Sequence, residues 1–117
     1  MKTMSSRERV WRAINFQEPD RVPIDIGGTK NTGLCIDAYA ELVKYLGFDL
    51  GPAKVYEQFM MLGRMDEPVR RRLACDVIEL ENPSENWGFE NKDWRPWTTS
   101  MGNRVLMPGD FKPVIDE

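Results

Sequence analysis

The sequence predicts an α/β protein in which helical segments alternate with short strands. Apolar residues recur at the 3.6-residue spacing of amphipathic helices in several stretches. Two short runs rich in β-branched and apolar residues, 22–26 and 75–81, are separated by these stretches. Strands separated by helices are typical of parallel sheets, because a parallel connection needs a long crossover. We therefore expect parallel strands with helices beside them.

The first helix is expected over residues 5–16. Its start carries a capping-box pattern, in which Ser5 is followed three residues later by Glu8. The apolar residues that fall on one side of it are Val10, Trp11 and Ile14. Two prolines, Pro19 and Pro23, favour a turn and extended chain, so they end the helix before the first strand.

Three further helices are expected between the two strands. The first, residues 33–47, has apolar residues at helical spacing and ends at Gly47. The second, residues 53–63, is weaker. Its apolar stripe consists of Val55, Phe59 and Leu62. The third is short, with Asp66 as its N-cap and Pro68 in its first turn. Its inward-facing residues are Val69 and Leu73.

A β-hairpin is expected over residues 94–108. Gly102 and Asn103 lie between β-prone segments, and glycine at the first central position suggests a two-residue type II′ loop. The aromatic residues of this region are Trp87, Phe89, Trp94 and Trp97. Such rings could stack on a sugar or a methoxylated ring, or they could cover apolar surface under the hairpin. Packing is the simpler interpretation.

The composition of the chain argues against several classes of function. The chain has 117 residues and a net charge of −3, and its basic residues are scattered apart from 70–72, which we place on the exposed face of a short helix. Nucleic acid usually needs a basic face, and a membrane helix needs about 20 apolar residues, so we expect neither partner. Cys35 and Cys75 are expected to be packed thiols of a reduced, cytoplasmic protein. The absence of histidine removes the commonest general base.

Several short motifs, in order, resemble a known family. The segment SSRERVWRAINFQEPDRVPIDIGG is similar to the opening of the uroporphyrinogen decarboxylase superfamily, which typically has a helix of the RERV..A kind, then PDRVP and a first barrel strand. AYAELVKYLG and RRRLACDVIELENP resemble the family's next helix and second strand. The resemblance spans residues 5–83 and implies the N-terminal portion of a TIM-like (β/α)8 barrel. On this interpretation, 1–117 is one incomplete domain and 87–108 is an aromatic-rich hairpin insertion.

One departure separates the two main branches of that superfamily. True decarboxylases follow the first strand with an arginine-bearing segment of the RQAGR type, which holds the carboxylates of the substrate. Here GGTKNTG stands in that place, with Lys30 as its only cation. Bidentate guanidinium contacts are the strong ones for carboxylates, so their absence argues against a substrate with many carboxylates. The chain resembles the other branch, the corrinoid- and coenzyme M-type methyltransferases and related O-demethylation enzymes.

The resemblance also points to substrate-binding residues, because active-site groups of a barrel lie at the C-terminal ends of its strands. In DIGGTKNTG, an aspartate could orient a polar group, two glycines allow close approach, and neutral side chains offer hydrogen bonds. The expected substrate-binding residues are Asp25, Gly27, Gly28, Thr29, Asn31, Thr32 and Glu81. The same residues could instead form solvated strand ends. No catalytic residue and no metal ligand is assigned.

In the methyltransferase relatives, a zinc ion held by His and Cys residues late in the chain activates a thiol. The resemblance therefore implies zinc and a corrinoid for a full-length parent, whereas we expect no cofactor in this chain. The implied partners are the rest of the barrel, a corrinoid protein and a small-molecule substrate, and the segment alone is expected to be inactive. The alternatives are a uroporphyrinogen decarboxylase of porphyrin biosynthesis and a free-standing, non-enzymatic module that binds a small ligand.

Overall fold

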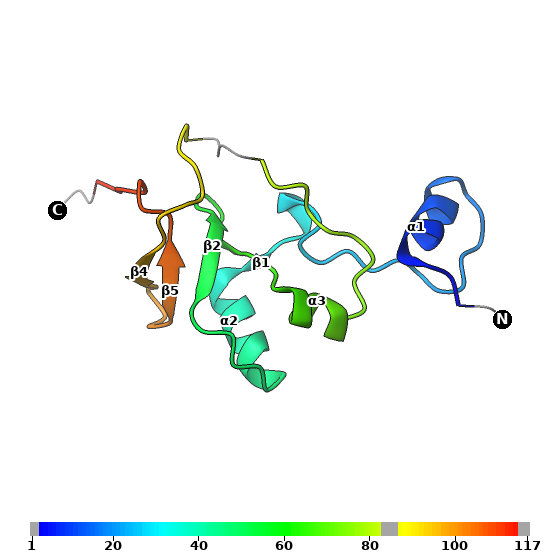
Figure 1. Cartoon of the computed structure of the whole chain (residues 1–117), viewed down its shortest axis with the longest axis horizontal. Helices are drawn as coiled ribbons and strands as arrows, with labels where there is room; N and C mark the ends of the chain where they lie inside the picture. Colours follow the sequence, from blue (N-terminus) through cyan, green and yellow to red (C-terminus); the bar gives the residue numbers. More distant parts are fainter. Residues whose placement is uncertain (1–2, 83–86, 115–117) are drawn as a thin grey trace. The chain divides into compact units, whose positions relative to one another are not determined.

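The computed structural model describes residues 3–82 and 87–114, which form a mixed α/β structure (Figure 1). The chain divides into two compact units. The N-terminal unit consists of Met1–Gly33 and Met65–Leu80, and the sheet unit consists of Leu34–Arg64 and Glu81–Glu117. The α/β class is confirmed, and each unit is described separately below.

The N-terminal unit contains the helices α1 (Ser6–Ile14) and α3 (Glu67–Arg72) and the short 3-10 turn η1 (Lys30–Thr32). The predicted N-cap of α1 is confirmed, since Ser5 Oγ accepts a hydrogen bond from Glu8 N at 3.2 Å. Helix α3 also begins as predicted, with Pro68 in its first turn, and its Val69 is fully buried. The burial of α1 differs from the expectation.

Arg9 is the buried residue of α1, with 4% of its surface exposed, whereas Trp11 and Ile14 are more than half exposed. The predicted apolar side of this helix is therefore not what the N-terminal unit buries. The cause is an ion-pair network around Arg9, described with the candidate site.

The two predicted strands of this unit do not form. Residues 22–26 and 75–81 run as plain chain in Figure 1 and pair at one point, where Asp76 N donates to Ile24 O at 2.8 Å. The reverse contact goes through a side chain, because Ile24 N donates to Asp76 Oδ2 at 2.9 Å. Pro23 has no N–H to give to a ladder. A carboxylate therefore holds these segments together in place of a strand ladder.

The sheet unit holds five strands in the order β1-β3-β2-β5-β4. Their bounds are β1 (Leu34–Cys35), β2 (Ala53–Glu57), β3 (Leu62–Gly63), β4 (Arg95–Thr98) and β5 (Arg104–Met107). Three neighbouring pairs are antiparallel, and β2 and β5 are the parallel pair. The expectation of a parallel arrangement is thus wrong for most of this sheet.

Residues 53–63 form the strands β2 and β3, not the predicted helix. Val55 is fully buried and Tyr56 is 93% buried, as expected for a central strand covered on both faces. Phe59, the middle residue of the supposed helical stripe, is 77% exposed. The helical spacing was therefore a coincidence of a strand followed by a turn.

Helix α2 (Ile36–Tyr45) packs against β1, β2 and β3 and confirms the helix predicted over residues 33–47. Gly47 follows it at φ +75°, the left-handed conformation of a helix end. The core of the sheet unit is formed by Ile36, Val55, Val105 and Met107. Gly63 brings β3 close to the helix, because an added Cβ would lie 2.9 Å from Tyr39 Cδ1.

The predicted hairpin is confirmed by the antiparallel pair β4–β5, but its turn is longer than expected. Thr99 N donates to Asn103 O at 3.0 Å, and Gly102 N donates to Thr99 O at 2.9 Å. Gly102 has φ +86°. A three-residue loop that closes with a left-handed glycine replaces the two-residue type II′ turn.

Candidate functional site

A compact turn over residues 25–32 contains six of the seven residues expected to bind substrate. The Asp25 carboxylate closes it, because its Oδ1 accepts hydrogen bonds from Gly28 N at 2.8 Å and from Thr32 Oγ1 at 3.1 Å. A backbone bond from Gly27 N to Thr32 O at 2.9 Å adds a second closure. Thr29 N also donates to Thr32 Oγ1 at 3.1 Å. The role of Asp25 here is to shape the turn.

Two glycines make this turn possible. Gly27 has φ +78°, a conformation that side chains other than glycine rarely adopt. Gly28 is buried, and an added Cβ would lie against Asp25 Oδ1 and 2.6 Å from Val77 Cγ1. The glycine pair is therefore required by sterics, with or without a ligand.

The turn presents neutral polar groups at its surface. Thr29 and Asn31 are exposed, whereas Thr32 is half-buried with its hydroxyl committed to the turn. Among the residues that the structure describes, the Asn31 amide has no hydrogen-bond partner. Asn31 is therefore the group of this turn best placed to meet a ligand.

The seventh expected residue, Glu81, belongs to the sheet unit. Its carboxylate forms a short ion pair with Arg64 Nη2, and both side chains are largely exposed. Exposed ion pairs contribute little to stability. The structure therefore gives Glu81 a surface ion pair, and the grouping of this residue with the turn remains a prediction.

An ion-pair network that the sequence did not reveal holds the N-terminal unit together. Arg9 donates to Asp20 Oδ1 at 2.6 Å and Oδ2 at 2.9 Å, and to Asp76 Oδ1 at 2.5 Å. Asp76 also accepts from Arg21 at 2.7 and 3.1 Å. Arg9 Nη2 donates to Met4 O at 2.7 Å. The network joins α1, the chain after it and the segment that follows α3.

The electrostatics of this network favour ionised carboxylates. Burial raises the pKa of Asp76, but the Ile24 N–H and the side chains of Ser6, Arg21 and Arg9 outweigh burial and lower the pKa to about 2. The side chain of Asp76 is fully buried. Hydrogen bonding to Arg9 holds the pKa of Asp20 well below its usual range. Each charged side chain of the network is therefore paired with one of opposite charge, and this pairing is what allows charges to be buried in a protein.

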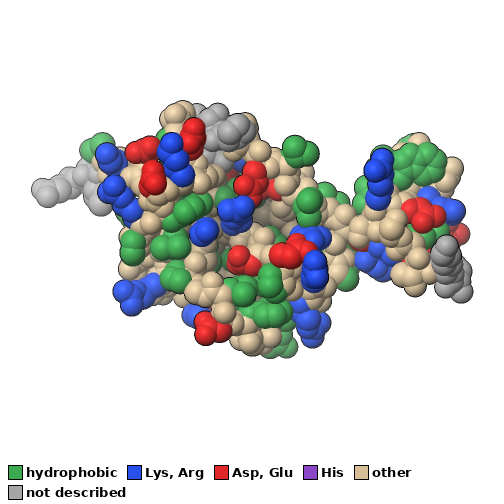
Figure 2. Space-filling model, in the orientation of Figure 1, with side chains coloured by type: hydrophobic (Ala, Val, Ile, Leu, Met, Phe, Trp, Pro, Cys, Tyr) green, Lys and Arg blue, Asp and Glu red, His purple; other side chains and the backbone are tan. Residues whose placement is uncertain are grey.

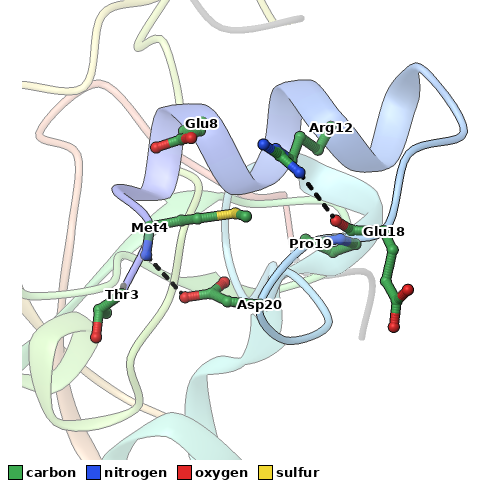
Figure 3. A pocket seen from close by; sticks show the side chains of 7 residues that line it. All are labelled: Thr3, Met4, Glu8, Arg12, Glu18, Pro19 and Asp20. Carbon is green, nitrogen blue, oxygen red and sulfur yellow. Dashed lines mark hydrogen bonds between the residues drawn. The ribbon is translucent and has the colours of Figure 1, made fainter. Parts of the chain in front are cut away.

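A hollow of about 530 Å³ lies beside this network (Figure 3). Its lining residues are Thr3, Met4, Glu8, Arg12, Glu18, Pro19 and Asp20. Figure 3 shows Arg12 directed to the Glu18 carbonyl, at 3.4 Å, and Asp20 accepting from Met4 N at 2.8 Å. The Glu18 carboxylate points away from the hollow in the same view. Several polar groups around this hollow are thus committed to the local structure.

The aromatic residues divide into three separate contacts within the sheet unit. Phe111 meets Trp97 edge-on at 5.8 Å between ring centroids and Phe89 at 6.4 Å. Lys54 lies over the Trp94 ring at 5.3 Å. The third contact pairs the exposed rings of Phe59 and Trp87 at 6.5 Å. Trp97 packs on the core, so the aromatic residues do not form one stacking surface.

A buried glutamine, Gln58, directly follows β2 and pairs with the half-buried Asn91. Gln58 is 5% exposed, and its Nε2 donates to Val55 O at 3.3 Å and to Asn91 Oδ1 at 3.2 Å. Asn91 Nδ2 donates to Tyr56 O at 2.8 Å. These bonds tie the chain before β4 to the end of β2, which is a structural role.

The residues present do not fit the zinc site that the resemblance implies. In the part of the chain that the structure describes, no three His, Cys, Asp or Glu side chains come together as a metal would require. Cys35 is exposed in the sheet unit, which corrects the expectation of a packed thiol, and Cys75 is buried in the N-terminal unit as predicted. Burial raises the pKa of the Cys75 thiol. Neither thiol therefore belongs to a metal centre in the described residues.

Surface features add two observations. On the face shown in Figure 2, acidic and basic side chains are interspersed. Large apolar residues of the N-terminal unit are also well exposed, namely Trp11, Ile14, Phe16, Val22, Ile78 and Leu80. None of the helices described has the length and apolar character that a bilayer crossing requires.

Comparison of the chain with protein-family models, with curated proteins and with solved structures gave no match.

Proposed function

We propose that this chain is the N-terminal part of a uroporphyrinogen decarboxylase-type barrel protein on its methyltransferase branch. The parent reaction would be methyl transfer that involves a corrinoid protein and a thiol or similar acceptor. The motif order from residue 5 to residue 83 supports this proposal. Cytoplasmic location is part of the proposal, and it accords with two thiols that form no disulfide.

The geometry of the turn closed by Asp25 carries the functional part of the proposal. The backbone N–H groups of Gly27 and Gly28 find acceptors within the turn, and the turn leaves the Asn31 amide at the surface. A neutral amide suits a substrate recognised by hydrogen bonds, whereas a substrate with many carboxylates would call for arginines. We infer that this turn lines one corner of a small-molecule pocket that further barrel residues complete.

The proposal also accounts for the missing metal ligands. A zinc site of the implied kind would draw its His and Cys residues from chain beyond residue 117, so no catalytic step is assigned to residues of this chain. Its own contribution is to bind and orient a substrate through the turn. Residues 1–117 alone are therefore expected to be inactive.

The test measures methyl transfer from methylcobalamin to a thiol by the full product of the gene that encodes this chain. Asn31→Ala should raise the substrate KM about two- to tenfold, because one hydrogen bond to substrate contributes about 0.5–1.5 kcal/mol. Gln17→Ala is the matched control, since Gln17 is an exposed amide of the same unit. Tight binding of a porphyrin that is lost in Lys30→Gln would instead support the decarboxylase alternative. Catalysis by the 117-residue chain itself would refute the proposal.

A further inference from the structure

A second hollow, of about 430 Å³, lies within the sheet unit and is independent of the function proposed above. It is bounded by α2, by the segment 48–53 and by the turn between β4 and β5. Its volume falls in the range of small-molecule pockets, about 300–1,000 Å³. The question is which ligand its lining would accept.

The lining combines apolar side chains with a polar rim. The apolar residues are Ala40, Val43, Phe48, Leu50, Pro52 and Ala53. Val43 is 8% exposed, whereas Leu50 is 38% exposed and so remains open to a ligand. An apolar group of a few carbon atoms would bury part of this surface and gain free energy from doing so. The hollow therefore favours a ligand with a small apolar body.

Hydrogen bonds between α2 and the hairpin turn hold the walls of the hollow in place. Asp37 Oδ1 accepts from Thr99 Oγ1 at 2.6 Å and from Asn103 Nδ2 at 2.8 Å. Lys44 Nζ donates to Asn103 Oδ1 at 3.2 Å and to Glu41 Oε1 at 2.7 Å. A preformed site loses less conformational entropy when it binds a ligand. The same bonds commit Lys44 and Asn103, so neither is the primary polar contact for a ligand.

Two charges of opposite sign remain on the rim. Arg104 and Asp49 both line the hollow, and neither forms an ion pair or side-chain hydrogen bond among the described residues. A guanidinium presents a planar set of donors that suits a carboxylate, and a carboxylate accepts from an ammonium group. A doubly charged anion would gain from Arg104 but would be repelled by Asp49.

We propose that this hollow binds a small zwitterion with an apolar body, of which an α-amino acid with an aliphatic side chain is the simplest case. The ligand carboxylate pairs with Arg104 and its ammonium group pairs with Asp49. The aliphatic side chain lies on the apolar lining near Leu50. Charge complementarity at both ends selects the zwitterion over a simple acid or a simple amine.

The test is an NMR titration of the isotope-labelled 117-residue chain with L-leucine. N-acetyl-L-leucine lacks the ammonium group and 3-methylbutylamine lacks the carboxylate, so these compounds are the comparison ligands. We expect saturable shifts of amides around the hollow with L-leucine and a Kd about two- to fivefold higher for each comparison ligand, as loss of one exposed ion pair predicts. Shifts that do not saturate, or equal binding of N-acetyl-L-leucine, would overturn the proposal.

Variants of the two rim charges complete the test. Arg104→Gln and Asp49→Asn should each raise the Kd for L-leucine about two- to fivefold. Arg72→Gln, an exposed arginine of the N-terminal unit, is the matched control and should leave the Kd unchanged. Leu50→Ser removes apolar lining without touching a charge, so it tests the site if a charge variant fails to fold. An unchanged Kd in Leu50→Ser together with either folded charge variant would contradict the assignment.

Discussion

Replacing Asp76 by asparagine tests the ion-pair network of the N-terminal unit with almost no change in side-chain volume. The carboxylate is fully buried and accepts four hydrogen bonds, from Arg9 Nη1, from both terminal nitrogens of Arg21 and from Ile24 N. Asparagine keeps one acceptor oxygen and places an NH2 group against a guanidinium. At least two of the four bonds are therefore lost, together with the negative charge.

The expected cost follows from what the arginines retain. Removing one partner of a buried ion pair costs about 3–5 kcal/mol. Arg9 keeps its two bonds to Asp20 and its bond to Met4 O, and Arg21 is 37% exposed and can turn to water. Asp76→Asn should therefore lower the free energy of unfolding of the N-terminal unit by about 3 kcal/mol, the low end of that range. This loss raises the equilibrium constant for opening of the unit about 150-fold.

Hydrogen exchange of the α1 amides measures this opening directly. Asp76→Asn should speed their exchange by about two orders of magnitude under conditions where opening is in equilibrium. Glu67→Gln is the control, because it removes an exposed carboxylate of the same unit that pairs with Arg70 and Arg71. If the α1 amides exchanged as slowly in Asp76→Asn as in Glu67→Gln, the ion-pair network would not be what holds this helix in place.

Four further results are expected. Asp76 has a pKa of about 2 in the folded protein against an ordinary 3.8, so its contribution to stability is complete above pH 3.8 and is lost as the pH falls toward 2. Circular dichroism of the wild-type chain should therefore show acid unfolding in this pH range, and the stability of Asp76→Asn should depend less on pH there. Gly28→Ala should destabilise the N-terminal unit by about 1–3 kcal/mol in urea titration, since its Cβ would press on Asp25 and Val77, and an unchanged midpoint for that unit would contradict this. A thiol reagent should modify the exposed Cys35 at once. It should modify Cys75 only on unfolding, because Cys75 is buried and burial raises the pKa of its thiol; peptide mass spectrometry distinguishes the two cysteines. Trp97→Ala should lower the free energy of unfolding by about 2 kcal/mol because Trp97 packs on the core, whereas Trp87→Ala, at an exposed ring, should change it little in the same urea titration.

Local signals predicted the parts of this fold that depend on neighbours in sequence. Ser5 caps α1, Pro68 lies in the first turn of α3, and Gly102 marks the hairpin turn. Each of these preferences arises within a few residues, from a hydrogen bond or a backbone conformation. A single sequence therefore contains enough information to place them.

Pairing over long distances in the sequence could not be predicted in the same way. Residues 53–63 carry apolar residues at helical spacing, but the parallel partner of β2 is β5, about fifty residues later. That pairing, with α2 on the sheet, decides the strand conformation, because tertiary packing outweighs local propensity. Conversely, 22–26 and 75–81 have strand composition but meet at a carboxylate and form no ladder.

The candidate site shows the same division. The need for Gly27 and Gly28 could be predicted from the end of an apolar run, and the structure places the expected polar residues of 25–32 in one turn. The partner of Arg9 could not be predicted, since Asp76 lies 67 residues away. Charged residues are rarely buried unless they are paired, and no local pattern marks such a pair.

The most direct measurement is a methyl-transfer assay on the full product of the gene that encodes this chain, with methylcobalamin as donor and a thiol as acceptor. The proposed function predicts methylation of the thiol by that protein and none by residues 1–117 alone. Decarboxylation of a porphyrinogen by the same protein, without methyl transfer, would contradict the assignment to the methyltransferase branch.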